Sequence, residues 1–184
     1  MQQEKKMRNT RKIVYTAMFA VLMAVCSWIS IPTAIPFTMQ TFAVFLALNY
    51  LGGKSGVISV IVYLLLGLIG LPVYANGTSG AGMLFGSTGG YMIGWIFSGL
   101  TMWLLEHALG HRPWAQAVSM IAGLFVCYAL GTAWYMAVYA SNTGPIGLWT
   151  AISWCVLPFV IPDILKLGLA FLIGKRLKQI VKPL

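Results

Sequence analysis

Residues 158–168 read PFVIPDILKLG, an apolar helical stretch with a charged pair inside it. Each Leu, Ile, Phe or Val gains about 0.3 to 0.6 kcal/mol on insertion at the centre of a membrane helix, whereas an Asp or Lys costs roughly 2.5 to 3.5 kcal/mol. Asp163 and Lys166 therefore offset most of what their own helix gains from its apolar residues. We expect such a costly pair to have a function inside the membrane.

The composition of the whole chain supports a membrane environment. Of the 184 residues, 59% are hydrophobic and only 8% are charged. These values and the repeated apolar runs predict an all-α integral membrane protein with one domain, 1–184, and no separate catalytic module. The net charge of +9 comes from residues gathered at the two chain ends rather than on a folded basic face, so we do not expect nucleic-acid binding.

Six membrane-spanning helices are predicted, separated by turns rich in Gly, Pro, Ser and Asn. The predicted spans are 13–31, 37–51, 57–71, 91–109, 114–140 and 149–174. The second and third of these spans are short. The segment 1–12 is a basic N-terminal extension, and 175–184 is a basic C-terminal tail. A cleaved signal peptide is the alternative for the N-terminus, but the apolar run is long and lacks a small-x-small cleavage site.

The basic residues give the orientation of this arrangement, because Lys and Arg in short loops favour the cytoplasmic side. Basic residues precede the first span, follow the second and fourth spans, and follow the sixth. These residues are Lys5, Lys6, Arg8, Arg11, Lys12, Lys54, Arg112, Lys175, Arg176, Lys178 and Lys182. Six spans with both termini in the cytoplasm place all of them on one side, and Lys166 is the exception.

The sixth span carries the predicted site. Asp163 and Lys166 are three residues apart, so on a helix they lie on one face and can share a polar cavity. Pro158 and Pro162 each remove a helical hydrogen bond, and the helix should bend there. Broken helices at membrane depth are tolerated where they line a cavity. The alternative is an ion pair that only holds helices together.

The external loop "PVYANGTSGAGMLFGSTGG", 72–90, is rich in glycine but also carries large apolar side chains. A solvated tether has little use for such groups, so we expect the loop to fold back over the membrane face as a lid; the alternative is an ordinary exposed loop. Asn76 opens the sequence "NGT", which is formally a glycosylation sequon, and it can instead offer its amide to a ligand.

Two other groups of residues have more ordinary interpretations. Cys26, Cys127 and Cys155 lie far apart within apolar spans and are typical of buried small hydrophobes rather than of a disulfide or metal set. Glu106, His107 and His111 have a spacing that a metal ion can use, but they adjoin the turn "GHRP", and the end of a helix at the membrane interface is the simpler interpretation. We predict no metal site and no cofactor.

Several stretches resemble the BioY family, the biotin-specific S components of energy-coupling factor (ECF) transporters. The matching stretches are "IPFTMQT" at 35–41, "VIVYLLLGLIGLPVYANG" at 60–77, "LFGSTGGYMIG" at 84–94 and "LPFVIPDILK" at 157–166. They span most of the chain in the family's order, and the resemblance is weakest over 103–148. Ser87 is a departure, because family members often have Pro there, and this affects the expected form of the lid.

The resemblance implies a six-helix protein of a bacterial plasma membrane that captures biotin from outside. A transmembrane coupling subunit and two ATPase subunits would drive its delivery inward. The protein itself would be no enzyme, and it has no "GxxxxGK[ST]" phosphate-binding loop. Two alternatives from other classes are a self-sufficient secondary transporter or channel, with Asp163 and Lys166 as a proton relay, and an intramembrane enzyme.

The chemistry of biotin fits the polar residues of the matching stretches. Its ureido ring has two N–H donors and one carbonyl, which Asp163, Lys166 and Asn76 can pair with, and Gln40 and Thr38 can add polar contacts. Apolar walls for the rest of the ligand are expected from aromatic residues. These are Phe37, Tyr74, Phe85, Tyr91 and Trp154. The biotin carboxylate would also be attracted to Lys166, so the reverse orientation of the ligand stays open.

The first span offers a stripe of small residues for a partner. Thr16, Ala20 and Ala24 recur at intervals of four residues, and small-xxx-small stripes let helix backbones approach closely. In the resembled family an Ala-x-x-x-Ala pattern in the first span docks the coupling subunit. We therefore expect this stripe to be the docking face.

Overall fold

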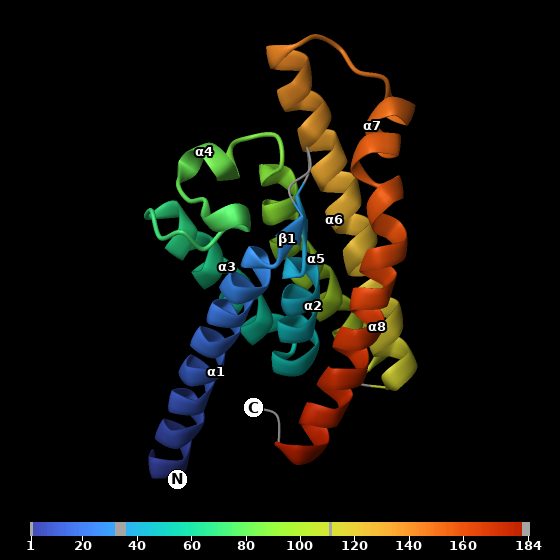
Figure 1. Ribbon diagram of the computed structural model, residues 1–184. Helices are drawn as coiled ribbons and strands as arrows, with labels where there is room; N and C mark the ends of the chain where they lie inside the picture. Colours follow the sequence, from blue (N-terminus) through green and yellow to red (C-terminus); the bar gives the residue numbers. More distant parts are fainter. Residues whose placement is uncertain (1, 32–35, 111, 182–184) are drawn as a thin grey trace.

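The computed structural model describes residues 2–31, 36–110 and 112–181, and helices make up most of it (Figure 1). The longer helices are α1 (Gln2–Trp28), α2 (Gln40–Leu51), α3 (Gly53–Leu68), α5 (Gly89–Leu109), α6 (Pro113–Asn142), α7 (Leu148–Cys155) and α8 (Leu157–Ile180). The short elements are β1 (Ser30–Ile31), β2 (Phe37–Thr38), the 3₁₀ turn η1 (Ala75–Gly77) and α4 (Ala81–Leu84).

Four of the described helices are long and apolar enough to cross a membrane, namely the part of α1 from Asn9 to Trp28, α5, α6 and α8. The helices α2 and α3 are apolar but have only 12 and 16 residues. At 1.5 Å per residue they extend roughly 18 and 24 Å, less than the roughly 30 Å of a hydrocarbon core. The six predicted spans thus correspond to four long helices and two shorter ones, with α7 preceding α8.

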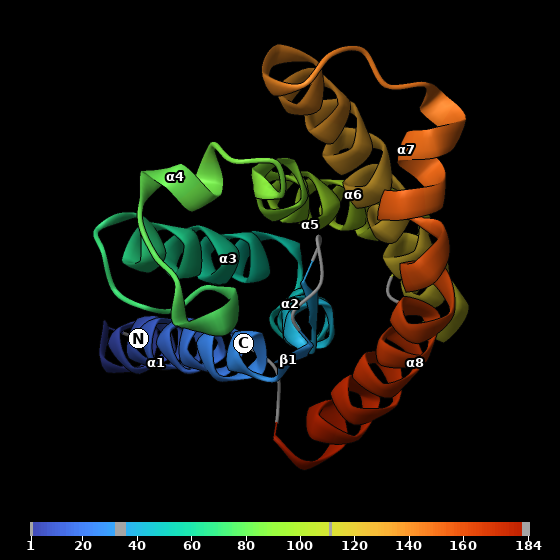
Figure 2. The same ribbon diagram turned by 45° about the horizontal axis from the view of Figure 1, so that its top comes forward.

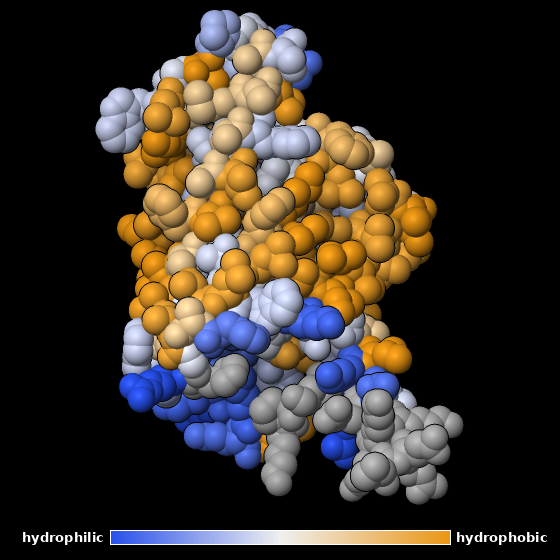
Figure 3. Space-filling view, turned by 180° about the vertical axis from the view of Figure 1, so that it is seen from behind, coloured by the Kyte–Doolittle hydropathy of each residue, from blue (hydrophilic) through white to orange (hydrophobic). Residues whose placement is uncertain are grey.

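The surface has the distribution expected of a protein whose middle faces lipid. Figure 3 shows an apolar belt across one face and hydrophilic residues gathered at one end of the molecule. The first turns of α1 and the last turns of α8 both lie at that end (Figure 1). Exposed basic side chains of the described residues include Arg11, Lys54, Arg112, Lys175 and Arg176.

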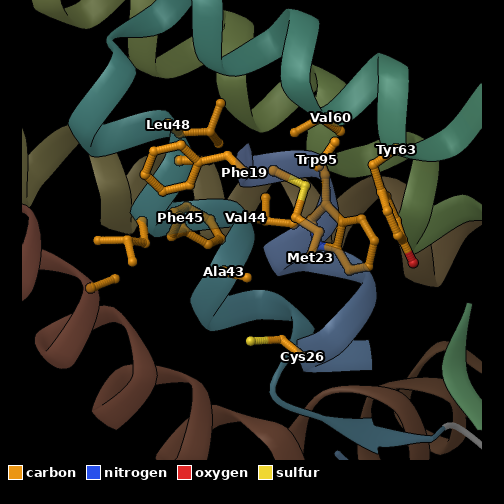
Figure 4. Close-up of a cluster of buried hydrophobic side chains, with 14 of the residues drawn as sticks. Phe19, Met23, Cys26, Ala43, Val44, Phe45, Leu48, Val60, Tyr63 and Trp95 are labelled. Atoms are coloured by element: carbon orange, nitrogen blue, oxygen red, sulfur yellow. The ribbon is translucent and has the colours of Figure 1, made fainter. Parts of the chain in front are cut away.

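Helix α2 lies at the centre of the bundle, and its first residue, Gln40, and all from Ala43 to Leu51 are buried. It packs against α1, α3 and α8. Figure 4 shows Val44 of this helix beside Met23 of α1, with Phe45 and, from α3, Val60 in the same buried cluster. Because α2 is surrounded on all sides, hydrophobic residues around its whole circumference are buried rather than exposed to lipid.

The second helix begins later than its sequence predicts. Phe37 and Thr38 were expected to open a helical span, but they form β2, which pairs antiparallel with β1. Pro36 lacks a backbone N–H, and the Oγ of Thr38 accepts the backbone N–H of Gln40 at 3.2 Å. This local bond satisfies a donor of the first helical turn and allows α2 to start at Gln40.

The predicted sixth span is divided into two helices. Val156 separates α7 from α8 with φ −121° and ψ −56°, and Pro158 lies in the first turn of α8. The sequence predicts bends at Pro158 and Pro162; the structure has a break at Val156, two residues before Pro158, and α8 continues through Pro162. A proline is tolerated in the first turn of a helix, because the first N–H groups have no helical partner there.

Candidate ligand-binding site

The charged pair of α8 is buried inside the bundle, as its cost in lipid requires. Asp163 is 4% exposed and Lys166 is 5% exposed. The Nζ of Lys166 lies 2.8 Å from Oδ1 of Asp163. The other carboxylate oxygen, Oδ2, accepts a hydrogen bond from the hydroxyl of Tyr128 in α6 at 2.7 Å. Both oxygens of the carboxylate thus have partners from the protein itself.

Lys166 has a second contact on its other side. Its Nζ lies 4.1 Å from the centroid of the Phe37 ring, a cation–π distance. Phe37 in turn stacks on Phe159 with ring centroids 6.0 Å apart. The strand β2 therefore brings an aromatic ring against the charged pair, which the sequence spacing alone does not reveal.

A cavity of about 90 Å³ opens beside the pair, between α2, α5, α6, α7 and α8. Its lining residues are Pro36, Thr38, Gln40, Thr41, Tyr74, Ala75, Met83, Thr88, Tyr91, Met92, Trp95, Leu124, Cys127, Tyr128, Cys155, Phe159, Asp163 and Lys166. The cavity combines aromatic and aliphatic walls with a few hydroxyl, amide and charged groups. Ligand sites for small molecules have this composition.

Six of the ten predicted ligand residues line this cavity. They are Thr38, Gln40, Tyr74, Tyr91, Asp163 and Lys166. Elements far apart in the chain bring them together, since they come from β2, the start of α2, the loop after α3, the start of α5 and the first half of α8. Phe37 is not among the lining residues but contacts Lys166 from behind the cavity wall.

Asn76, Phe85 and Trp154 lie outside the cavity. Asn76 is exposed in η1 with a left-handed φ of 57°, and its Oδ1 accepts the hydroxyl of Ser30 at 2.6 Å. Phe85 is 64% exposed at the end of α4. Trp154 is 51% exposed and packs edge-on against Tyr139, because α7 turns its neighbour Cys155 inward instead.

The side chain of Tyr74 connects the glycine-rich loop to the bundle. Its hydroxyl donates to the carbonyl of Leu64 at 2.6 Å, and its ring lies over Gly67, where an added Cβ would come within 2.1 Å of the ring. Burial raises the pKa of Tyr74 to about 12, so the hydroxyl stays protonated at neutral pH and can donate. Gly67 is therefore needed for the close approach of the loop.

Further hydrogen bonds attach both ends of the loop. Ser27 Oγ and Tyr63 Oη each donate to the carbonyl of Val73, at 2.7 and 2.9 Å. Trp134 Nε1 of α6 donates to the carbonyl of Gly86 at 3.0 Å. Figure 2 shows the loop and α4 on the same side of the molecule as α3 and the start of α5. The loop is thus fixed near its two ends.

Two polar side chains of the cavity are held by residues that do not line it. Gln40 Nε2 donates to the hydroxyl of Tyr63, and the hydroxyls of Tyr91 and Thr132 lie 3.0 Å apart. These bonds orient Gln40 and Tyr91 from outside the cavity. The arrangement can accept and donate hydrogen bonds to a compact polar group while its aromatic walls hold an apolar one.

Sequence reasoning missed several lining residues, Tyr128 above all. It lies in the stretch 103–148, where the family resemblance is weakest, and its hydroxyl offers the only local signal. Cys127 and Cys155 are buried free cysteines, as expected, but both also line the cavity. Glu106 is buried and its Oε2 accepts the backbone N–H of Gly53 at 3.4 Å, while His111 lies outside the described residues.

The small-residue stripe of α1 faces inward rather than outward. Ala20 is 1% exposed and Ala24 is 7% exposed. The backbone carbonyl of Thr16 accepts the hydroxyl of Ser59 in α3 at 3.1 Å. Ala20 and Ala24 let α1 approach α2 and α3 within the molecule, whereas the side chain of Thr16 is half-buried. The structure thus places the two alanines inside the bundle, where the sequence predicts an exposed docking stripe.

Comparisons with known proteins give a consistent result. The sequence profile of the BioY family matches residues 1–183. The biotin transporter BioY of Thermotoga maritima is 42% identical over 171 residues, which cover 92% of this chain and 97% of the relative. The probable biotin transporter BioY of Pyrococcus horikoshii is 32% identical over 171 residues, which cover 92% and 98%.

Solved structures share the fold. The crystal structure of the S-component for biotin from an ECF-type ABC transporter matches with a TM-score of 0.83 and 26% identity, covering 94% of this chain and 93% of that one. The S component of a bacterial ECF transporter matches with a TM-score of 0.53 over 95% of this chain, and its 18% identity shows likeness of fold alone.

Proposed function

The chain belongs to the BioY family, and on that premise we propose that it binds biotin as the S component of an ECF transporter. It is a multi-pass membrane protein and a transporter component rather than an enzyme. The observation that carries the proposal is the buried pair of Asp163 and Lys166 at the wall of a cavity with aromatic sides. A charged pair at this depth is costly unless a polar ligand or its own partners satisfy it.

The ureido ring of biotin pairs with this charged end of the cavity. Its two N–H groups donate to the Asp163 carboxylate and its carbonyl accepts from Lys166. The bicyclic ring then lies between aromatic walls such as Tyr91, Trp95 and Phe159. The valeryl carboxylate lies nearer the backbone N–H groups of the loop. In exchange for the ligand bonds, Asp163 and Lys166 give up part of their contact with each other.

Binding involves movement, because the cavity of about 90 Å³ is smaller than the roughly 300 to 1,000 Å³ of typical small-molecule sites. The glycine-rich loop acts as the lid that opens and closes. In its middle, from η1 to the start of α4, Asn76 accepts one exposed hydrogen bond from Ser30, and the backbone N–H of Gly80 donates to the carbonyl of Gly67 at 2.7 Å. Closure around the ligand brings the Asn76 amide to the ureido group.

Six helices cross the membrane with both termini in the cytoplasm. The gathering of exposed basic residues at the end that carries both termini supports this orientation. Transport is driven by a transmembrane coupling subunit and two ATPase subunits, in keeping with the match to an S-component of an ECF-type transporter. The coupling subunit contacts exposed surface, because Ala20 and Ala24 are buried.

The proposal is tested on the protein purified in detergent without partner subunits. Mass spectrometry of bound small molecules should identify biotin, and titration calorimetry of the stripped protein should give one site. Failure to bind biotin when folded would overturn the proposal. Biotin uptake by liposomes that contain this chain alone, dependent on a proton gradient, would instead indicate the self-sufficient transporter.

A further inference from the structure

A second hollow lies between α6 and α7–α8. It has a volume of about 950 Å³. Its walls include Leu124, Phe125, Tyr128 and Thr132 of α6 and Ile164 and Leu167 of α8. We refer to it as the apolar groove. Apart from the hydroxyls of Tyr128 and Thr132, its side chains are all apolar.

The apolar groove runs along helices that are long enough to cross a membrane, and several of its lining side chains are exposed on the surface of the bundle. Phe125 is one of these. In a bilayer such a surface faces the hydrocarbon core. In water, the groove would expose these apolar side chains to solvent.

Two residues, Leu124 and Tyr128, line both the groove and the ligand cavity. The partition between the two spaces is therefore about one side chain thick. Hydrogen bonds cross it at two places: Tyr128 Oη donates to Asp163 Oδ2 at 2.7 Å, and the hydroxyls of Thr132 and Tyr91 lie 3.0 Å apart. Tyr91 and Asp163 belong to the cavity, while Thr132 belongs to the groove.

We propose that Tyr128 is a positioning and specificity residue of the ligand site: its hydroxyl orients the Asp163 carboxylate, and its ring keeps acyl chains of the membrane out of the cavity. This inference rests on the proposed binding of biotin. A binding site inside a lipid bilayer meets hydrocarbon at very high local concentration, so an apolar cavity needs a barrier against it. The ring of Tyr128 forms this barrier, and its hydroxyl orients the Asp163 carboxylate.

The hydroxyl has a role separate from that of the ring. One oxygen of Asp163 contacts Lys166 and the other contacts Tyr128, so the carboxylate is held from two sides. Without the hydroxyl the carboxylate can rotate about its side-chain bonds, and Oδ2 loses the hydrogen bond that Tyr128 donates to it. Hydrogen bonds to charged groups are stronger than those between neutral groups.

Two variants separate these roles. Tyr128→Phe keeps the ring and removes the hydroxyl; we expect biotin affinity to fall about tenfold, the usual effect of losing a hydrogen bond to a charged group, with no new sensitivity to hydrocarbon. Tyr128→Ala opens the partition; we expect a larger loss, which increases further as 1-decanol is added. Titration calorimetry of biotin on protein in phosphatidylcholine nanodiscs, with and without 1-decanol, measures both effects.

Phe125→Ala is the matched control, because Phe125 lines the groove but not the cavity. Its biotin affinity should equal that of the parent, and 1-decanol should not change it. If Tyr128→Ala does not fold, Tyr128→Leu is used in its place. Leu keeps an apolar side chain in the partition but is shorter than Tyr. A general loss of stability would lower the melting temperature without creating competition between biotin and 1-decanol.

Comparison of the parent with the Tyr128 variants separates failure of the role of Tyr128 from failure of biotin binding. A parent protein that does not bind biotin would overturn the proposed function. A parent that binds, with a Tyr128→Phe variant that binds equally well, would show that the hydroxyl does not orient Asp163. If 1-decanol does not weaken biotin binding to Tyr128→Ala, or to Tyr128→Leu where the alanine variant does not fold, the ring is no partition.

Discussion

At the scale of single residues, Asp163 is the most highly constrained side chain of the site. Its two oxygens face different helices, because Lys166 lies one turn along α8 and Tyr128 comes from α6. A carboxylate buried in this way is stabilised only while both partners remain. The same two oxygens are the natural acceptors for the N–H groups of a ureido ring. Stability and ligand binding therefore depend on the same atoms.

Substitutions of this pair distinguish a binding site from a structural ion pair. Asp163→Asn should weaken biotin binding about ten- to a hundredfold, or about 1 to 3 kcal/mol, since a ligand donor loses its charged acceptor. Lys166→Met should weaken binding comparably. Titration calorimetry on detergent-solubilised protein, with folding checked by size-exclusion chromatography, measures both.

The double variant of Asp163 and Lys166 provides the decisive comparison. Removing both charges leaves no stranded ion, so the protein should fold as well as the parent or better, whereas each single variant strands a buried charge. We expect the double variant to bind no better than the single variants. If it bound biotin like the parent, the pair would be structural and would not belong to the ligand site.

Among the helices, α1 shows that packing determines which of two apolar faces is buried and which faces lipid. Its buried side, with Ala20 and Ala24, packs inside the bundle, and its exposed side carries Val21 and Met18. Both sides are apolar. Small side chains on the buried side let the backbones of α1 and its neighbours approach, while larger ones on the exposed side meet lipid.

A bulky residue on each side of α1 tests this assignment. Ala20→Trp should destabilise the protein by about 1 to 3 kcal/mol or more, because there is no room for an indole at a buried alanine. Val21→Trp, one residue along and exposed, should leave stability nearly unchanged. Thermal unfolding in detergent measures both. Equal melting temperatures for the two variants would contradict the inward orientation of Ala20.

At the scale of the whole molecule, the arrangement of helices predicts which loops face outside. The loop after α3 and the turn after α6 should be external, and the turn between α2 and α3 should be cytoplasmic. Cysteines introduced at Thr78 and Thr143 should react with an impermeant thiol reagent in sealed cells, and one at Ser55 should not. The native cysteines are buried, which keeps the background low.

Labelling at Ser55 without disruption of the cells would overturn the six-span arrangement. Permeabilised cells provide the control, since Ser55 should then react. The short helices α2 and α3 make this measurement informative, because their lengths alone do not require that they cross a full bilayer.

Features that depend on neighbours along the chain can be predicted from the amino-acid sequence alone. Asp163 and Lys166 lie on one face of α8 because they are three residues apart, and Pro158, which lacks an N–H, predicts a break in the last span, which the structure has two residues earlier at Val156. Apolar composition predicted membrane helices, and quoted motifs indicated the family. Each of these conclusions needs only local geometry or a residue's own chemistry.

Which apolar faces point inward depends on how the helices pack against one another in the folded protein. In a soluble protein a polar face identifies the outside of a helix, but in a membrane the lipid-facing and core-facing sides are both apolar. Sequence pattern therefore could not tell that Trp154 points away from the cavity, that Ala20 is buried, or that Tyr128 meets Asp163. Those placements follow from how α1, α6 and α7 rotate to fit their neighbours, because packing rather than hydrophobicity sets the rotation of a helix in lipid.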